Sequence, residues 1–184
     1  VEIGQPGRGA PDWFEVTEDQ IDRNDPDCVW RQRSVKNRNC LELWSPVRWV
    51  AQIVKLIVPL RTFQVRMLDT GEADTWRYAD GNWTLNSSRL AQGSERRPVC
   101  QGVFRRSNPL VDGEAVTTVL YINTNKTADI AKFGSENGYI LPWPAGGPIH
   151  LDVVYWLEKL RKWQEKYNPI SLRTPCTHLD IRYC

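Results

Sequence analysis

A stripe of apolar side chains between two prolines is the feature that most limits the folds open to this chain. After Ser45-Pro46, apolar residues recur at steps of three and four until Pro59 is reached. The stripe consists of Val47, Val50, Ala51, Val54, Ile57 and Val58. This spacing places all of them along one side of an α-helix. Ser45 can accept hydrogen bonds from the free amides of the first turn, and Pro59 ends or kinks the helix. We therefore expect a helix here that buries one broad face.

Two further segments have helical spacing. The spacing resumes through residues 60–68, where Arg61 opens the segment and Gly71 lies beyond its end as the expected stop. A longer amphipathic helix is expected over about residues 150–167, because apolar residues line one side of it and charged residues fill the other. Asn168-Pro169 ends this helix.

Strand patterns fill much of the chain between these helices. Residues 74–85 are typical of a hairpin whose turn is Asp80-Gly81, and residues 98–104 can form another strand. The most distinct strand, within residues 117–125, is expected to pair with one within 139–144. Helices followed by a small antiparallel β-sheet and a final helix predict an α+β fold. The hydrophobic share of 41% and the charged share of 25% fit a globular chain.

Several classes of function have no support in the sequence. Five cysteines at wide spacings and only two histidines argue against a metal site and a disulfide framework, and free thiols favour a cytoplasmic location. The chain has neither a GxxxxGK nor a GxGxxG loop, so we expect no nucleotide cofactor and no other cofactor. It also lacks the GxSxG motif of serine hydrolases. Its longest apolar run, residues 47–60, is too short and too charged to span a membrane.

Positive charge is concentrated locally, although the formal net charge is only +2. Three short segments are rich in basic residues: Arg31, Arg33, Lys36 and Arg38; Arg96 and Arg97; Arg105 and Arg106. Each cluster is compatible with an ordinary solvated face. Together they favour a phosphate-rich partner, and we expect these residues to contact double-stranded DNA.

Arg61 and Lys126 are the two residues that are best suited to phosphate chemistry. An arginine at the start of a helical segment can present its planar guanidinium to a phosphate beside free backbone amides. Lys126 lies in a polar turn between two predicted strands, where it can donate a proton to a leaving oxygen. The plain alternatives are a surface or capping arginine and an ordinary turn lysine.

Two stretches resemble the catalytic domain of the tyrosine recombinases, also called phage integrases. Residues 59–76 are similar to the segment around the first catalytic arginine of that family, and residues 120–144 to its β-hairpin lysine segment. The matching positions are Arg61, Gln64, Val65, Leu68, Asp69 or Asp74, Lys126, Thr127, Ile140, Leu141 and Pro142. The resemblance covers about residues 45–168, the first half of that catalytic domain, and is closest to integrase-like proteins of bacterial mobile elements.

The resemblance implies a site-specific enzyme that cuts and rejoins DNA through a phosphotyrosine link, without metal or nucleotide. By this resemblance Arg61 would bind the scissile phosphate, Lys126 would protonate the leaving 5′ hydroxyl, and Thr127 would contact DNA. The family also implies self-association on DNA.

The chain departs from the family pattern near its end. The family needs a His-x-x-Arg motif and a tyrosine well downstream, but here Arg182 follows His178 by four residues and Tyr183 comes directly after it. The chain also starts without methionine. We therefore expect a piece of a longer recombinase that is inactive alone.

The expected organisation has three parts. These are an N-terminal loop, linker and basic segment (1–44), a partial catalytic domain (45–168) and a C-terminal tail (169–184). Thr17 can cap a short helical turn in the first part. The alternatives are an inactive DNA-binding module and a protein-interaction domain that uses a surface rich in tryptophan, of which the chain has nine.

Overall fold

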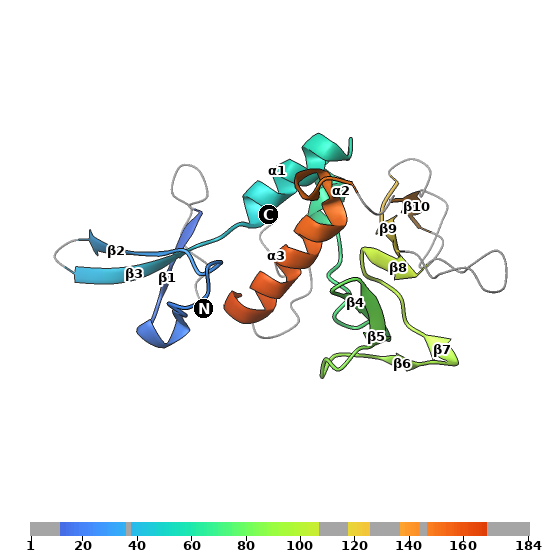
Figure 1. The fold of residues 1–184 in the computed structure, drawn as a ribbon, viewed down its shortest axis with the longest axis horizontal. Helices are drawn as coiled ribbons and strands as arrows, with labels where there is room; N and C mark the ends of the chain where they lie inside the picture. Colours follow the sequence, from blue (N-terminus) through green and yellow to red (C-terminus); the bar gives the residue numbers. More distant parts are fainter. Residues whose placement is uncertain (1–11, 36–37, 107–117, 126–136, 144–146, 169–184) are drawn as a thin grey trace. The chain divides into compact units, whose positions relative to one another are not determined.

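The computed structural model describes residues 12–35, 38–106, 118–125, 137–143 and 147–168. The chain divides into two compact units. We call residues 1–52 with 159–184 the terminal unit and residues 53–158 the central unit (Figure 1). Two helices, α1 (Val47–Ile57) and α3 (Val153–Tyr167), have residues in both units.

A three-stranded antiparallel sheet forms the described start of the terminal unit. Strand β3 (Arg38–Trp44) lies between β1 (Trp13–Val16) and β2 (Trp30–Val35). The sheet packs on the last turns of α3 through a buried cluster of Val16, Cys28, Leu43, Trp163 and Tyr167. These strands were not expected from the sequence, because an acidic stretch followed by a basic one indicated a charged loop or linker. In the structure those charges pair across the strands, as Arg31 does with Glu42.

Besides its parts of α1 and α3, the central unit contains one short helix and three small antiparallel sheets within its described residues. The helix α2 spans Thr62–Arg66. Two hairpins follow, β4 (Trp76–Ala79) with β5 (Asn82–Leu85) and β6 (Gly93–Ser94) with β7 (Arg97–Pro98). A three-stranded sheet has β9 (Thr118–Ile122) between β8 (Phe104–Arg106) and β10 (Tyr139–Pro142). Single 3-10 turns occupy Glu18–Gln20 (η1), in the terminal unit, and Ile149–Leu151 (η4).

The main expectations from the sequence are confirmed. The described chain has an α+β fold, and α1, α2 and α3 lie within the predicted helical segments. The first hairpin turns at Asp80-Gly81, where both residues have positive φ angles (50° and 82°), as a tight hairpin turn requires. Strand β10 pairs with β9 in the register Tyr139↔Ile122. The predicted turn at Thr17 is the start of η1, where the Thr17 amide donates to Gln20 Oε1 over 3.0 Å.

One strand lies later in the chain than expected. The sequence indicated a strand over 98–104, whereas β8 begins only at Phe104 and Val99–Gly102 are not in a strand. The reason is a side chain: the carboxylate of Asp74 accepts the amide hydrogens of Gln101 (2.5 Å) and Gly102 (2.9 Å). These amides therefore need no partner strand. The predicted boundaries of the three parts of the chain stay a prediction.

Burial of one face of the β8–β9–β10 sheet is a main source of stability in the central unit. Leu120 of β9 is 1% exposed, whereas Leu56 of α1 is 86% exposed. Removing a buried leucine side chain costs apolar transfer energy and leaves a cavity. We predict that Leu120→Ala lowers the free energy of unfolding by about 2–5 kcal/mol. Urea unfolding measures this, with Leu56→Ala as the matched control. Equal losses for the two variants would show that this face is not a core.

Within the terminal unit, an acid–base cluster joins the end of α3 to the segment between η1 and β2. Asp25 Oδ2 accepts hydrogen bonds from Lys166 Nζ (2.7 Å) and from the Tyr167 hydroxyl (2.6 Å). Lys166 also donates to Asp22 (2.7 Å). These bonds lower the pKa of Asp25 from 3.8 to about 2, with Lys166 as the largest cause. The ionised carboxylate is thus favoured in the folded chain over the unfolded one.

This cluster predicts a pH dependence of stability. Because the folded pKa of Asp25 is lowered, its contribution is fully present above pH 3.8 and is lost as pH falls toward about 2. The difference in unfolding free energy between the wild type and Asp25→Asn should therefore be largest near neutral pH and should shrink through this window. Urea unfolding at a series of pH values measures it. Asp19→Asn, at an exposed position on η1, is the control. A difference that stays constant with pH would contradict the prediction.

Candidate nucleic-acid interface

Arg61 lies directly before α2 with its side chain exposed to solvent. Its backbone is extended (φ −68°, ψ 148°), and its amide donates to Oε1 of Gln64 over 3.0 Å. Leu60, one residue earlier, is buried and anchors this turn to the core. Among the described residues no carboxylate forms an ion pair with the Arg61 guanidinium. The side chain is therefore available to an anion, whereas the backbone amide beside it is already used by Gln64.

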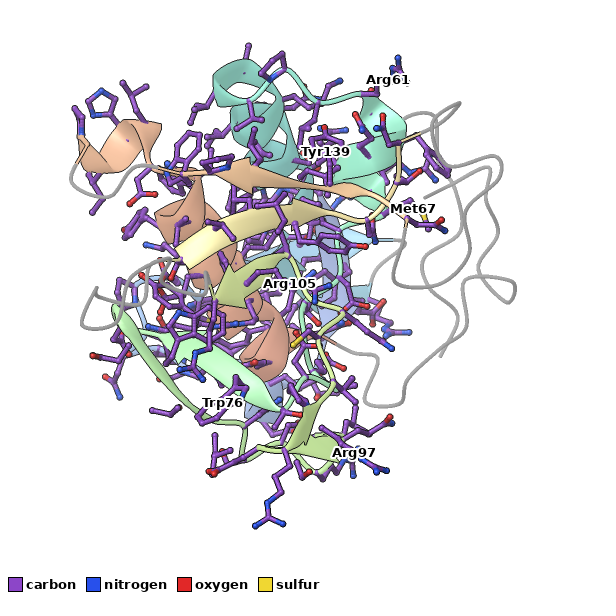
Figure 2. All side chains as sticks on the ribbon, turned by 90° about the vertical axis from the view of Figure 1, so that its right-hand side faces the viewer. Arg61, Met67, Trp76, Arg97, Arg105 and Tyr139 are labelled. Carbon is purple, nitrogen blue, oxygen red and sulfur yellow. The ribbon has the colours of Figure 1, made fainter. Side chains whose placement is uncertain are left out.

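Gln64 joins the Arg61 turn to the sheet. The side chain is 7% exposed, and its Nε2 donates to the carbonyl oxygen of Thr124 (2.9 Å) and more weakly to the hydroxyl of Tyr139 (3.4 Å). Thr124 follows β9 directly and Tyr139 begins β10. Figure 2 shows Tyr139 near Arg61 at the same end of the central unit. One buried amide group thus connects the arginine turn with both strands of the hairpin that leads to and from Lys126.

The other end of α2 is fixed to the same strand end. Asn123 donates from Nδ2 to the carbonyl oxygen of Met67, the residue that follows the helix. Gly138, directly before β10, packs closely against the end of β9, since a Cβ at this position would lie 2.1 Å from the carbonyl oxygen of Ile122. Only glycine fits there, and its φ of 78° also favours glycine. The base of the β9–β10 hairpin is therefore held in one arrangement against α2.

Three of the predicted site residues lie outside the described residues: Lys36, Lys126 and Thr127. The remaining predicted residues fall into two groups by unit. Arg61, Arg96, Arg97, Arg105 and Arg106 belong to the central unit, and Arg31, Arg33 and Arg38 to the terminal unit.

Two of the central arginines rest on aromatic rings. The Arg105 guanidinium lies 4.1 Å from the centre of the Tyr121 ring, and its Nε donates to the carbonyl oxygen of Gly102 (3.1 Å). The Arg106 guanidinium lies 4.3 Å from the centre of the Trp76 ring. Stacking on a ring holds a guanidinium in a defined plane while its N–H groups stay able to bind an anion. The sequence indicated the two arginines but not their rings, since Trp76 and Tyr121 come from other strands.

The arginines of the terminal unit are paired with acids. Glu42 binds Arg31 at 2.6 Å and Arg33 at 3.6 Å, and Arg38 forms an ion pair with Glu15. Arg31 also lies over the ring of Trp13. A basic cluster in the sequence is thus a nearly neutral cross-strand network in the structure. The acids come from β1 and β3, so a local count of charge in β2 could not reveal the pairing.

The described residues hold no group of three or more histidine, cysteine or acidic side chains that could bind a metal ion. None of the helices in the described part of the chain is both long and apolar enough to cross a membrane.

A comparison with protein families identifies the chain. The model of the family Integrase_2, described as "Putative integrase", matches residues 2–177. No curated protein and no solved structure matches the sequence. The family match spans nearly all of the 184 residues and includes both units, with α2 and the β9–β10 hairpin. This protein therefore belongs to the Integrase_2 family of integrases.

Proposed function

We propose that the protein binds double-stranded DNA through its central unit, as part of a tyrosine recombinase that cuts and rejoins DNA strands. One observation carries this proposal beyond the family match: the buried Gln64 amide joins the turn of Arg61 to the strand end that precedes Lys126. Two cations that serve one phosphate must be held in a constant relation, because small displacements weaken transition-state contacts. A hydrogen-bonded bridge between their supporting segments meets this need.

The proposed chemistry assigns one role to each cation. The Arg61 guanidinium binds the non-bridging oxygens of the scissile phosphate and stabilises the charge that they gain in the transition state. A tyrosine hydroxyl attacks phosphorus and loses its proton to solvent water, the bond to the 5′ oxygen breaks, and the Lys126 ammonium gives that oxygen its proton. We assign no residue of this chain as the attacking tyrosine. The reaction requires no nucleotide and no metal ion for its balance of atoms and charge.

Our proposal also includes the expected self-association, biological context and cellular location. The protein would associate with further copies on DNA, serve a mobile element and work in the cytoplasm. The described cysteines Cys28, Cys40 and Cys100 are free thiols, which supports a reducing compartment.

A DNA-binding module without chemistry is the second candidate. It is favoured by the stacked pairs Arg105–Tyr121 and Arg106–Trp76, because guanidinium groups held on rings suit static backbone contacts. In this case Arg61 and Lys126 would contribute to affinity only, and strand cleavage would be absent from any assembly that contains the chain.

DNA binding tests the proposal first. We predict that the wild-type chain binds a fluorescent duplex with an affinity that falls steeply with salt, and that Arg61→Gln and Lys126→Gln each lower the slope of log K against log salt by about 1. Fluorescence anisotropy over a salt series measures this. The control is Arg23→Gln, which removes the same charge from an exposed arginine paired with Glu18. A wild-type chain that ignores duplex DNA at low salt would contradict the proposed function.

Gln64 allows a test of the bridge itself. We predict that Gln64→Ala weakens DNA binding in the wild-type background but has little further effect when Arg61→Ala is already present. The reason is that the two residues act as one unit, so their losses should not add. Binding of the single and double variants measures the coupling. Gln52→Ala, at an exposed position of α1, is the control. Additive losses would mean that Gln64 only stabilises the fold.

A further inference from the structure

The β6–β7 hairpin projects two arginines from the central unit without a core of its own. Every residue from Gln92 to Pro98 is exposed, and we call these residues the arginine arm. The strands pair Gly93 with Pro98 and Ser94 with Arg97, so Glu95 and Arg96 form the turn. A hairpin of this size is not stable by itself. Its position must be set by contacts at its base.

A buried threonine holds both ends of the arm. Thr75 is 5% exposed, and its Oγ1 donates to the carbonyl oxygen of Gln92 (2.6 Å) and accepts the amide hydrogen of Val99 (2.9 Å). Its own amide donates to the carbonyl oxygen of Val99 (2.9 Å), and the amide of Gln92 donates to Ala73 (3.0 Å). The two ends of the arm are thus clamped to the segment that leads into β4, and the tip is free of apolar packing.

A second clamp fixes the loop that enters the arm. The side-chain amide of Asn86 donates to the carbonyl oxygens of Glu72 (3.0 Å) and Asp74 (2.8 Å), and its backbone amide donates to Thr75 (2.9 Å). Several hydrogen bonds, most of them partly buried, therefore set the direction of an exposed hairpin. Such an arrangement is expected where the tip has to meet a partner.

The arm differs from the other basic segments in its charge pairing. Among the described residues the guanidinium groups of Arg96 and Arg97 form no ion pair, whereas Arg31 and Arg33 are paired with Glu42. The one acid in the arm is Glu95, at the turn. The arm therefore presents a net positive charge to solvent, with guanidinium groups that have no carboxylate partner in the part of the chain that the structure describes.

The arm and Arg61 lie at opposite ends of the central unit. Figure 1 shows α2 at the upper end and the β6–β7 hairpin at the lower end, and Figure 2 shows Arg105 at a level between Arg61 and Arg97. A compact unit of about a hundred residues is roughly 30 Å across, close to one turn of duplex DNA at about 34 Å. A single phosphate compound cannot reach both ends, but a linear polyanion can.

We propose that the arginine arm is a second DNA-contact site, which grips the duplex backbone about one helical turn from the phosphate bound at Arg61. This inference rests on the proposed function, since it assumes that the central unit binds DNA. The arm contributes affinity and register through phosphate contacts, and it takes no part in the chemical step. Arg105, stacked on Tyr121, lies at a level between the two contacts in Figure 2.

Salt-dependent DNA binding by the full chain tests the arm. The variant pair Arg96→Gln with Arg97→Gln should weaken binding about tenfold or more at about 0.1 M salt and lower the salt slope by about 2. The control pair is Arg23→Gln with Arg48→Gln, which removes the same charge from two exposed arginines that are paired with Glu18 and Asp12. It should change the slope by much less. Arg96→Lys with Arg97→Lys keeps the charge and should restore most of the slope.

Duplex length makes the test specific to the arm. On a duplex of about half a helical turn the arm variants should bind as the wild type does, while Arg61→Gln still weakens binding. On a duplex of about three turns both defects should appear.

Equal effects of the arm pair and the control pair would show a general effect of net charge and would overturn the proposed contact at the arm. Arm variants that match the wild type on long DNA would also overturn it, while leaving DNA binding at Arg61 intact. If the wild type binds no duplex at all, both the arm and the proposed function fail.

Discussion

A buried pair of neighbouring residues, Asp74 and Thr75, holds the central unit together. Asp74 is 4% exposed, and burial raises the pKa of its carboxyl group, while the amides of Gln101 and Gly102 and the charge of Arg105 oppose this shift. A buried carboxylate is costly unless it is hydrogen-bonded, so the bonds from these two amides offset part of the cost of burying Asp74. The bonds fix the chain just before β8, and Thr75 fixes the arginine arm. The sheet and the exposed hairpin thus depend on the same turn.

Electrostatics divides the arginines of this integrase-family protein into groups that differ in how readily they can bind an anion. Arg31 and Arg33 of β2 both pair with Glu42 of β3, and exposed pairs of this kind contribute little to stability but reduce the charge that a polyanion meets. Arg105 and Arg106 are oriented by aromatic rings. Arg61 and the two arginines of the arm form no ion pair among the described residues. A net charge of +2 therefore conceals a strongly uneven distribution.

Hydrogen bonds from amide side chains connect segments that are distant in the sequence. Gln64 and Asn123 hold the two ends of α2 against the end of β9, and Asn86 holds the loop before the arm. An amide is suited to such work because it donates and accepts at once. In the proposed recombinase these bonds would keep the phosphate-binding groups in position without using charged residues, which remain available to DNA.

Local sequence determined the helices, the Asp80-Gly81 hairpin and the pairing of β9 with β10, because helical spacing, turn chemistry and strand pattern depend on residues close together in the chain. It also indicated Arg61, whereas Gln64 was indicated only as a position that matches the tyrosine recombinase pattern. It could not reveal the sheet of the terminal unit or the late start of β8. Packing against Trp163 and Tyr167, far along the chain, decided the first, and the buried Asp74 carboxylate decided the second. The tertiary structure alone likewise decided which arginines are paired, stacked or exposed. The reason is that their partners lie on other strands, distant in the sequence.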